Sequence, residues 1–133
     1  MILTDISVLI DLFRGNDNQP VTTFKEILQN NVPFSITSLL YQEILQGARN
    51  QKEYALLNRY LSSQRFLHPK DDIITYRKAA LIYYRARRNG ITIRSATNCL
   101  IAQIAIEHQA YLLHNDNDFK RIAEFTQLKL FRV

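Results

Sequence analysis

Short apolar runs alternate along the chain with longer segments in which apolar residues recur every three or four positions. Short runs bounded by turn residues are typical of buried strands, whereas the longer spacing is typical of amphipathic helices. Asn89-Gly90 is a typical helix end. The pattern predicts strands at 2–4, 34–36, 65–67, 111–113 and 128–133, and helices at about 5–13, 20–30, 38–48, 51–63, 71–89, 95–108 and 116–125.

This alternation predicts an α/β fold, in which a mostly parallel sheet of about five strands is flanked by helices on both faces. Ligands of such sheets bind outside the carboxyl ends of the strands. Residues that directly follow a predicted strand are therefore the first place to search for chemistry.

The composition fits one domain over residues 1–133. A chain of this length can bury a hydrophobic core without disulfides, and its three glycines and three prolines leave no linker that would divide it. Cys99 is the single cysteine, which fits a reducing cytoplasm. No secretion signal and no apolar run of membrane-spanning length are found, so we expect a cytoplasmic protein that does not contact the membrane.

The net charge of +5 is modestly positive. It favours an anionic partner such as RNA, DNA or an acidic protein segment, although many soluble domains carry this charge without such a partner.

Two acidic residues occupy informative positions in the first half of the chain. Asp5 directly follows the first predicted strand, so we expect it at the carboxyl edge of the sheet, unless it only caps the next helix. Glu43 lies beside the apolar stripe of Leu40 and Ile44. A carboxylate there needs a cation or metal, unless it reaches water or pairs with Arg49.

A second pair of acids, Asp116 and Asp118, follows the predicted strand 111–113. An acidic group at the end of a second strand is what a shared metal site requires, although one of the two also suits a helix cap. An EF-hand calcium loop is excluded, because the loop has no glycine at its sixth position and no final glutamate in register.

Position 98 is unusual. If Ser95 caps the helix 95–108, Asn98 is the third helical residue and shares a face with Ile101 and Ala102. An acidic residue there would complete a reciprocal cap and suit the helix dipole, whereas asparagine is neutral. Taken as plain structure, Asn98 would be a surface or capping amide. Other chemistries lack support, because the chain has no GxGxxG, P-loop or HExxH motif and no signature of a cysteine nucleophile.

Together these segments resemble a PIN domain from end to end. The resemblance rests on residues 2–11, 42–48, 99–102 and 115–119, which follow one another as the motifs of that family do. Three of these ranges contain the acids described above. Residues 90–95, Gly-Ile-Thr-Ile-Arg-Ser, narrow the resemblance to VapC-type toxins of bacterial toxin–antitoxin pairs.

The resemblance implies a PIN-like α/β/α sandwich with a five-stranded parallel sheet and a site for Mg²⁺ or Mn²⁺. It implies an endoribonuclease that cuts RNA, often tRNA, that is silenced by a cognate antitoxin, and that in many members is a homodimer. The residues that it assigns to catalysis and metal binding are Asp5, Glu43, position 98 and Asp116, with Asp118 as a supporting acid and Ser7 lining the site.

Asn98 departs from the family pattern, which has aspartate at this position. Asparagine keeps the shape but lacks the charge, so we expect weak or absent activity in this chain. The exchange is either natural or a deliberate change that lets a growth-inhibiting nuclease be produced. The alternative function is a catalytically silent PIN fold that binds RNA or its antitoxin, and a further alternative is cleavage of DNA by the same site.

Four arginines, Arg85, Arg87, Arg88 and Arg94, surround the Asn89-Gly90 turn that leads to position 98. They suit contacts with an RNA backbone, but arginines also suit a solvated helix end. Tyr83 and Tyr84 are candidates for stacking on bases, and their helical spacing makes at least one of them a core residue.

Overall fold

The computed structural model of the protein describes residues 1–132. Strands and helices follow one another in the predicted order. They are β1 (Ile2–Thr4), α1 (Ile6–Phe13), α2 (Gln19–Gln29), β2 (Ser35–Ile36), α3 (Ser38–Gln46), α4 (Gln51–Ser62), β3 (Arg65–Phe66), α5 (Asp72–Arg88), α6 (Ala96–Glu107), β4 (Tyr111–Leu113), α7 (Asn117–Ala123) and β5 (Lys129–Leu130).

The five strands form one parallel sheet in the order β3-β2-β1-β4-β5, which confirms the predicted α/β fold. The chain extends the sheet from β1 to β2 and β3 on one side, then returns to place β4 and β5 on the other. The order therefore reverses between β1 and β4, where Thr4 pairs with Leu113. Parallel sheets bind their ligands at such a reversal, outside the carboxyl ends of the strands.

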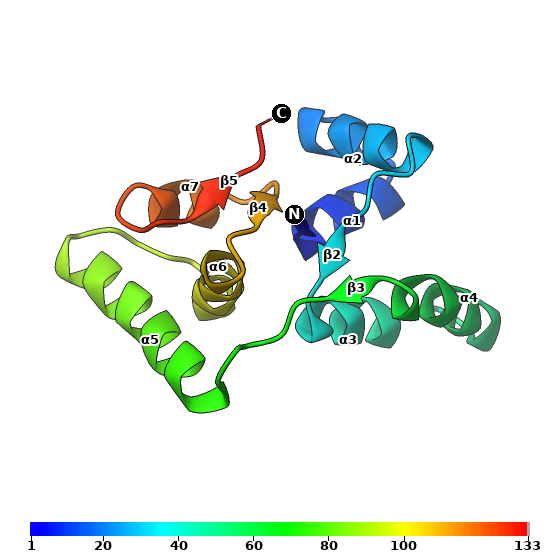
Figure 1. Ribbon diagram of the computed structural model, residues 1–133. Helices are drawn as coiled ribbons and strands as arrows, with labels where there is room; N and C mark the ends of the chain where they lie inside the picture. Colours follow the sequence, from blue (N-terminus) through cyan, green and yellow to red (C-terminus); the bar gives the residue numbers. More distant parts are fainter. Residues whose placement is uncertain (133) are drawn as a thin grey trace.

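Helices cover both faces of the sheet (Figure 1). Leu3 and Leu112, which are paired in register, contact one core cluster together with apolar side chains of α5, α6 and α7. Ile36 and Leu113 contact the other cluster with side chains of α1, α2, α3 and α4. Successive strand residues such as Leu112 and Leu113 thus face opposite layers, which explains why both are fully buried.

Polar side chains fix the first turns of several helices. Asn18, Asn50 and Asp71 each accept hydrogen bonds from the backbone N–H groups that open α2, α4 and α5. At α3 the cap is Thr37 and not the first residue of the predicted segment, Ser38, because the Thr37 hydroxyl accepts from Leu40 N at 3.2 Å.

Some predicted boundaries differ from the observed ones. The predicted helix 38–48 ends at Gln46, and the helix expected after Pro20 begins at Gln19, with the proline in its first turn. The predicted strand 128–133 is Lys129–Leu130, and residue 133 lies outside the described range. Within residues 1–132, no helix is both long and apolar enough to cross a membrane.

Candidate active site

Asp5 lies at the carboxyl end of β1, where its backbone N–H donates to Leu113 O of β4 at 2.9 Å. It caps α1, because Oδ2 accepts from Ser7 N at 3.1 Å and from Ser7 Oγ at 2.7 Å. Ser7 Oγ in turn accepts from Asn115 N at 2.9 Å, which ties the start of α1 to the loop after β4. Asp5 is therefore both a helix cap and a buried residue of the sheet edge, with 5% of its surface exposed.

The acids that follow β4 have different surroundings. Asp116 caps α7, since its Oδ1 accepts from Asp118 N at 2.9 Å. Asp118 is fully buried, and its two oxygens accept from Arg94 N at 2.9 Å and Ser95 N at 3.0 Å. Asp118 also forms an ion pair of 3.7 Å with Arg121.

Asp118 holds the residues that lead into α6, whereas the capping bond that the sequence assigns to Ser95 is not made. Ser95 occupies the N-cap position of α6, but its side chain makes no capping hydrogen bond. The carboxylate that receives the backbone N–H of Ser95 comes from α7, 23 residues further along the chain. The approach to α6 is therefore fixed by a contact between distant parts of the sequence.

Asn98 is buried, with 9% of its surface exposed, so the reading of it as a surface amide is wrong. Its Nδ2 donates to Asp116 Oδ2 and to Asp118 Oδ2, each at 3.0 Å. The amide thus bridges the two acids. A carboxylate at this position would instead place a third negative charge next to them.

One pocket of about 240 Å³ brings together the four residues proposed from sequence, Asp5, Glu43, Asn98 and Asp116. Ser7 and Asp118 are not among its lining residues, but Ser7 donates to Asp5 and the backbone N–H of Asp118 donates to Asp116. Sequence reasoning missed the hydroxyl residues of the wall, which are Thr4, Thr37, Ser95 and Thr97. Thr37 follows β2 directly, so the rule that found Asp5 also applies to it.

The pocket acids are incompletely paired. The Glu43 side chain has no hydrogen bond or ion pair within residues 1–132, and the alternative pairing with Arg49 is wrong because Arg49 binds Glu53 at 3.0 Å. Glu43 is half-buried, so its carboxylate reaches water, as the other alternative predicts. Burial raises the pKa of Asp5, and the charge of Asp116 raises it further, against the effect of the Ser7 hydrogen bonds. Thr4 Oγ1 is buried and has no hydrogen-bond partner in the described chain.

These side chains suit a hard divalent cation. Carboxylate and hydroxyl oxygens are the ligands that Mg²⁺ and Mn²⁺ prefer, and a cation would stabilise the charged form of Asp5 and give Glu43 a partner. The described residues nevertheless contain no cluster of three acidic, histidine or cysteine side chains close enough to hold a metal. At the fourth position Asn98 presents an N–H donor and no charge.

Cys99 and His114 lie near the pocket, but their surroundings do not suit a nucleophile or a general base. Burial, with a contribution from Asp118, raises the pKa of Cys99 to about 11, so this thiol stays protonated at neutral pH. Burial lowers the pKa of His114, whose Nδ1 accepts from Asp116 N at 3.1 Å. His114 therefore orients the Asp116 backbone and is not among the residues that line the pocket.

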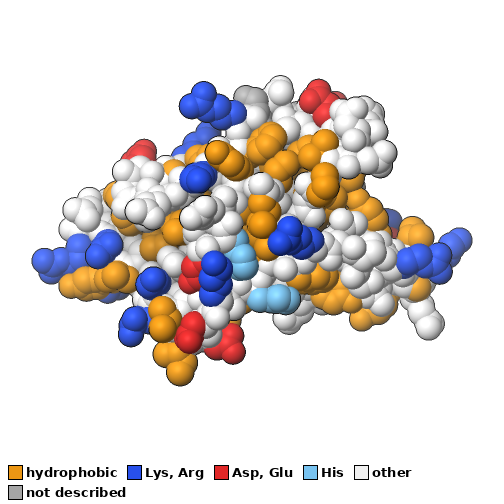
Figure 2. Space-filling view, in the orientation of Figure 1, with side chains coloured by type: hydrophobic (Ala, Val, Ile, Leu, Met, Phe, Trp, Pro, Cys, Tyr) orange, Lys and Arg blue, Asp and Glu red, His pale blue; other side chains and the backbone are white. Residues whose placement is uncertain are grey.

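The four arginines lie outside the pocket. Arg85, Arg87 and Arg88 are exposed in the last turn of α5, and Arg94 is exposed on the segment before α6. Figure 2 shows Lys and Arg side chains gathered at the left end of the molecule, where α5 ends in Figure 1. Asp118 accepts from the backbone N–H of Arg94, so the backbone from which this side chain extends is fixed beside the site.

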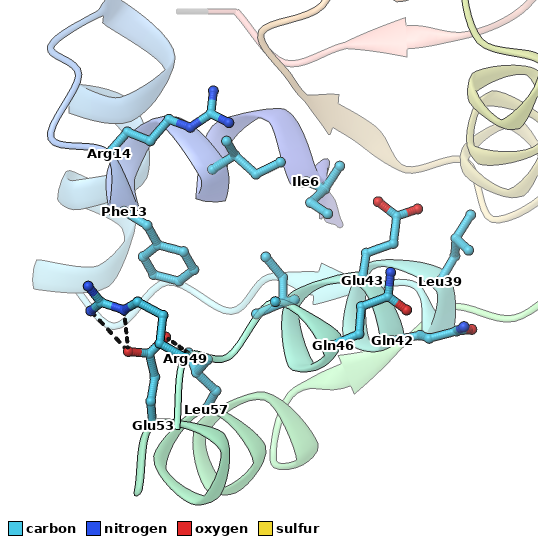
Figure 3. A pocket seen from close by; sticks show the side chains of 13 residues that line it. Ile6, Phe13, Arg14, Leu39, Gln42, Glu43, Gln46, Arg49, Glu53 and Leu57 are labelled. Carbon is cyan, nitrogen blue, oxygen red and sulfur yellow. Dashed lines mark hydrogen bonds and ion pairs between the residues drawn. The ribbon is translucent and has the colours of Figure 1, made fainter. Parts of the chain in front are cut away.

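A larger groove of about 830 Å³ adjoins the pocket between α1, α3 and α4 (Figure 3). Its wall is partly apolar, with Ile10, Phe13 and Leu57, and the Phe13 side chain is 55% exposed. Glu43 lines both the groove and the pocket, so the two cavities meet at this carboxylate.

Comparison with known proteins identifies the class. The PIN domain family matches residues 2–125. The chain is 36% identical over 130 residues to ribonuclease VapC11 of Mycobacterium tuberculosis and to a VapC ribonuclease of Mycobacterium bovis. These alignments cover 97% of this chain and 96% of each relative. The chain therefore belongs to the PIN-domain family and, within it, to the VapC type.

Solved structures share the fold. VapBC-1 from nontypeable Haemophilus influenzae superposes with a TM-score of 0.72 at 20% identity, over 98% of this chain and 97% of that chain. VapBC2 from Rickettsia felis, bound to a DNA fragment from its promoter, has a TM-score of 0.69 at 19% identity over 98% of each chain. FitAcB from Neisseria gonorrhoeae has a TM-score of 0.68 at 19% identity, over 99% of this chain and 97% of that chain.

Proposed function

We propose that this protein has the scaffold of a metal-dependent endoribonuclease toxin, and that Asn98 disables or strongly weakens the chain as it stands. The observation that carries this proposal is the convergence of Asp5, Glu43 and Asp116 with position 98 on one pocket at the reversal of the sheet. The 36% identity to VapC ribonucleases over nearly the whole chain supports RNA as the substrate, and tRNA is the RNA that the family resemblance implies.

Asp5, Glu43 and Asp116 are the residues that would hold Mg²⁺ or Mn²⁺. Such a cation supplies positive charge for the phosphodiester and acidifies water for hydrolysis. The chain's own groups prepare the pocket. Ser7 holds the carboxylate of Asp5 in place, and Asp118 holds the backbone of Ser95 at the pocket wall.

Asn98 favours a second candidate function for the chain as it stands, a silent PIN fold that binds RNA or its antitoxin. The amide donates to Asp116 and Asp118, so it satisfies the acids without a cation. Asn98 also leaves the site with one carboxylate fewer, and a Mg²⁺ ion is held by so few carboxylates that the loss of one is serious. Both candidate functions keep the same fold and differ only in what position 98 permits.

The test is cleavage of single-stranded RNA and of tRNA by this chain and by Asn98→Asp, with Mg²⁺, with Mn²⁺ and with EDTA. We expect Asn98→Asp to cut RNA in either metal and to lose activity in EDTA, while this chain cuts at least about 100-fold more slowly. A DNA strand of the same sequence tests the 2′-OH requirement.

The control is Asn30→Asp, which adds the same charge at the exposed end of α2, away from the pocket and the arginines. It should leave cleavage at the level of this chain. If Asn98→Asp cuts neither RNA nor DNA, the catalytic proposal fails and the binding function takes its place.

We further propose that a cognate antitoxin lies in the groove of Figure 3 and reaches the pocket at Glu43. The exposed, apolar Phe13 suits a hydrophobic residue of such a segment, as in helix-in-groove recognition. Structures with the same fold include a toxin–antitoxin complex from Klebsiella pneumoniae and VapBC2 from Rickettsia felis, which supports this partner. Phe13→Asp should weaken antitoxin binding, and Tyr54→Asp, outside the groove, should not.

A homodimer and a cytoplasmic location complete the proposal. Ile73 and Tyr76 at the start of α5 are 79% and 53% exposed, which is unfavourable for apolar side chains on a free monomer surface. Light scattering of the purified chain, with Ile73→Glu as the comparison, tests whether this surface pairs two copies.

A further inference from the structure

A separate cavity of about 270 Å³ lies where α5 ends. It is lined by Tyr83, Arg87, Gly90, Ile91, Thr92 and Ile93. None of these residues lines the catalytic pocket or the groove. The cavity therefore needs its own explanation.

The cavity combines an aromatic ring with a cation. Tyr83 is half-buried and packs against the core cluster of α5, α6 and α7, which holds its ring in place. The guanidinium carbon of Arg87 lies 5.9 Å from the centre of the ring. Flat aromatic surfaces and arginines are the groups on which proteins stack single-stranded bases.

The surrounding charge suits a polyanion. Arg85, Arg88 and Arg94 are exposed near the cavity, and the described part of the chain gives them no acidic partner, since its ion pairs are Arg49–Glu53 and Arg121–Asp118. Unpaired arginines around an aromatic cavity favour an RNA strand, whose phosphates attract them while one base enters the cavity.

The cavity lies close to the catalytic pocket. Ile93 lines the cavity and Ser95 lines the pocket, so these two residues are separated by at most about 7 Å of chain. Asp118 accepts from the N–H groups of Arg94 and Ser95, which fixes the connecting segment. An RNA strand that follows this segment would therefore meet both cavities.

We propose that this cavity binds one nucleobase of an RNA strand whose phosphodiester lies in the catalytic pocket. The base stacks on the ring of Tyr83, and Arg87 supplies the positive charge beside it. This inference rests on the proposed function for the identity of the substrate. It adds a binding subsite that positions RNA and takes no part in the bond cleavage itself.

The test measures binding of a fluorescein-labelled single-stranded RNA to this chain in EDTA, where no cleavage competes. The compared variants are Tyr83→Leu, which removes the ring, and Tyr84→Leu, which removes an exposed tyrosine outside the cavity. We expect Tyr83→Leu to weaken binding by about 5- to 100-fold and Tyr84→Leu by less than about twofold. Tyr83→Phe keeps the ring and should bind as this chain does.

A base-specific signal separates stacking from a general loss of structure. RNA carrying 2-aminopurine should lose fluorescence on binding to this chain, to Tyr84→Leu and to Tyr83→Phe, but not to Tyr83→Leu. Arg87→Gln should weaken binding more than Arg88→Gln, although each removes one charge, because only Arg87 lines the cavity.

Several outcomes overturn the subsite. Equal binding by the two leucine variants does so, as does unchanged 2-aminopurine fluorescence with every form, or the absence of RNA binding by this chain. Failure of the proposed function is a different result, in which Asn98→Asp does not cut RNA while Tyr83-dependent binding persists.

Discussion

The two ends of α6 each have a half-buried carboxylate and a buried threonine hydroxyl nearby, but these polar groups are paired differently at the two ends. At the carboxyl end, Glu107 accepts from Thr75 Oγ1 at 2.7 and 2.9 Å, from Lys70 N at 3.1 Å and from Gln103 Nε2 at 3.2 Å. Near the amino end, Glu43 has no partner within residues 1–132, and the buried hydroxyl of Thr4 has none either.

This difference separates a structural carboxylate from a candidate functional one. The hydrogen bonds from Thr75, Lys70 and Gln103 outweigh burial and lower the pKa of Glu107, whereas burial with too few donors raises the pKa of Asp5. Buried polar groups are normally hydrogen-bonded, so the unpaired hydroxyl of Thr4 is an exception at the pocket end. We infer that the unpaired polar groups at the amino end of α6 bind a ligand, such as the proposed cation, that the chain itself does not supply.

The largest expected effect contrasts the two ends in the Asn98→Asp background. Asp5→Asn should lower RNA cleavage by more than about 100-fold, because it removes charge from the pocket. Glu107→Gln, at the other end of the helix, should change the rate by less than about twofold. Initial rates with a labelled RNA in Mg²⁺ measure both. Equal losses would show that the two ends do not differ in function.

The second effect concerns stability and position 98 alone. In EDTA, Asn98→Asp should lower the free energy of unfolding by about 2–4 kcal/mol, because two N–H donations are lost and three carboxylates become neighbours. Mg²⁺ or Mn²⁺ should restore much of this loss by binding the folded state. Urea unfolding at neutral pH with and without metal provides the measurement. This chain, whose amide already bridges the acids, should respond little to metal.

A smaller effect depends on pH. Burial raises the pKa of Asp5 above its ordinary value of 3.8, so the folded state prefers the protonated acid. The stability that Asp5 contributes is complete below pH 3.8 and is lost as the pH rises through the folded pKa. Asp5→Asn keeps the cap and stays neutral, so it should be more stable than this chain at pH 7, with a gain that shrinks toward pH 3.8.

Asp118→Asn is the contrasting variant for this measurement. Asp118 accepts from two backbone N–H groups and from Asn98, and an amide has only one acceptor oxygen. It should therefore destabilise the protein at pH 7, where Asp5→Asn stabilises it. Loss of stability in both variants would show that Asp5 is as well paired as Asp118.

The order of strands and helices could be predicted because it depends on local periodicity and on turn residues such as Gly90, which has a φ of +72°. The positions of Asp5 and Asp116 could be predicted because acids that follow neighbouring parallel strands meet at one edge of the sheet. Glu43 is singled out by its place beside an apolar stripe, and the family resemblance assigns it and position 98 to the same site as the two aspartates. The structure places all four residues on one pocket.

The details that depend on distant contacts could not be predicted. Nothing local reveals that Ser95 makes no capping hydrogen bond or that Asp118 accepts from its backbone N–H, because the two residues meet only after α6 and β4 have formed. Thr37 and Ser38 are both good capping residues, and a helix boundary predicted from the sequence pattern is not accurate enough to choose between neighbouring residues. The burial of Asn98 likewise follows from the acids that pack against it.

The smallest expected effect compares two buried threonines, one at each end of α6. Thr75 is fully buried and donates to Glu107, so Thr75→Val should cost about 1–2 kcal/mol of unfolding free energy. Thr4 is 1% exposed and its hydroxyl has no partner in the described chain, so Thr4→Val should be neutral or stabilise by up to about 1 kcal/mol. Urea unfolding of the two variants beside this chain measures the difference.

The pair is well matched, because both substitutions exchange one hydroxyl for a methyl group of similar size at a site closed to solvent. Equal losses would mean that the Thr4 hydroxyl is satisfied in solution, and the pocket would then lose its clearest sign of an unfilled polar position. A loss of stability in Thr75→Val alone would show that the polar groups at the carboxyl end of α6 are paired within the chain. The pocket end would then be the part of the fold whose polar groups gain their partners from a bound cation and substrate.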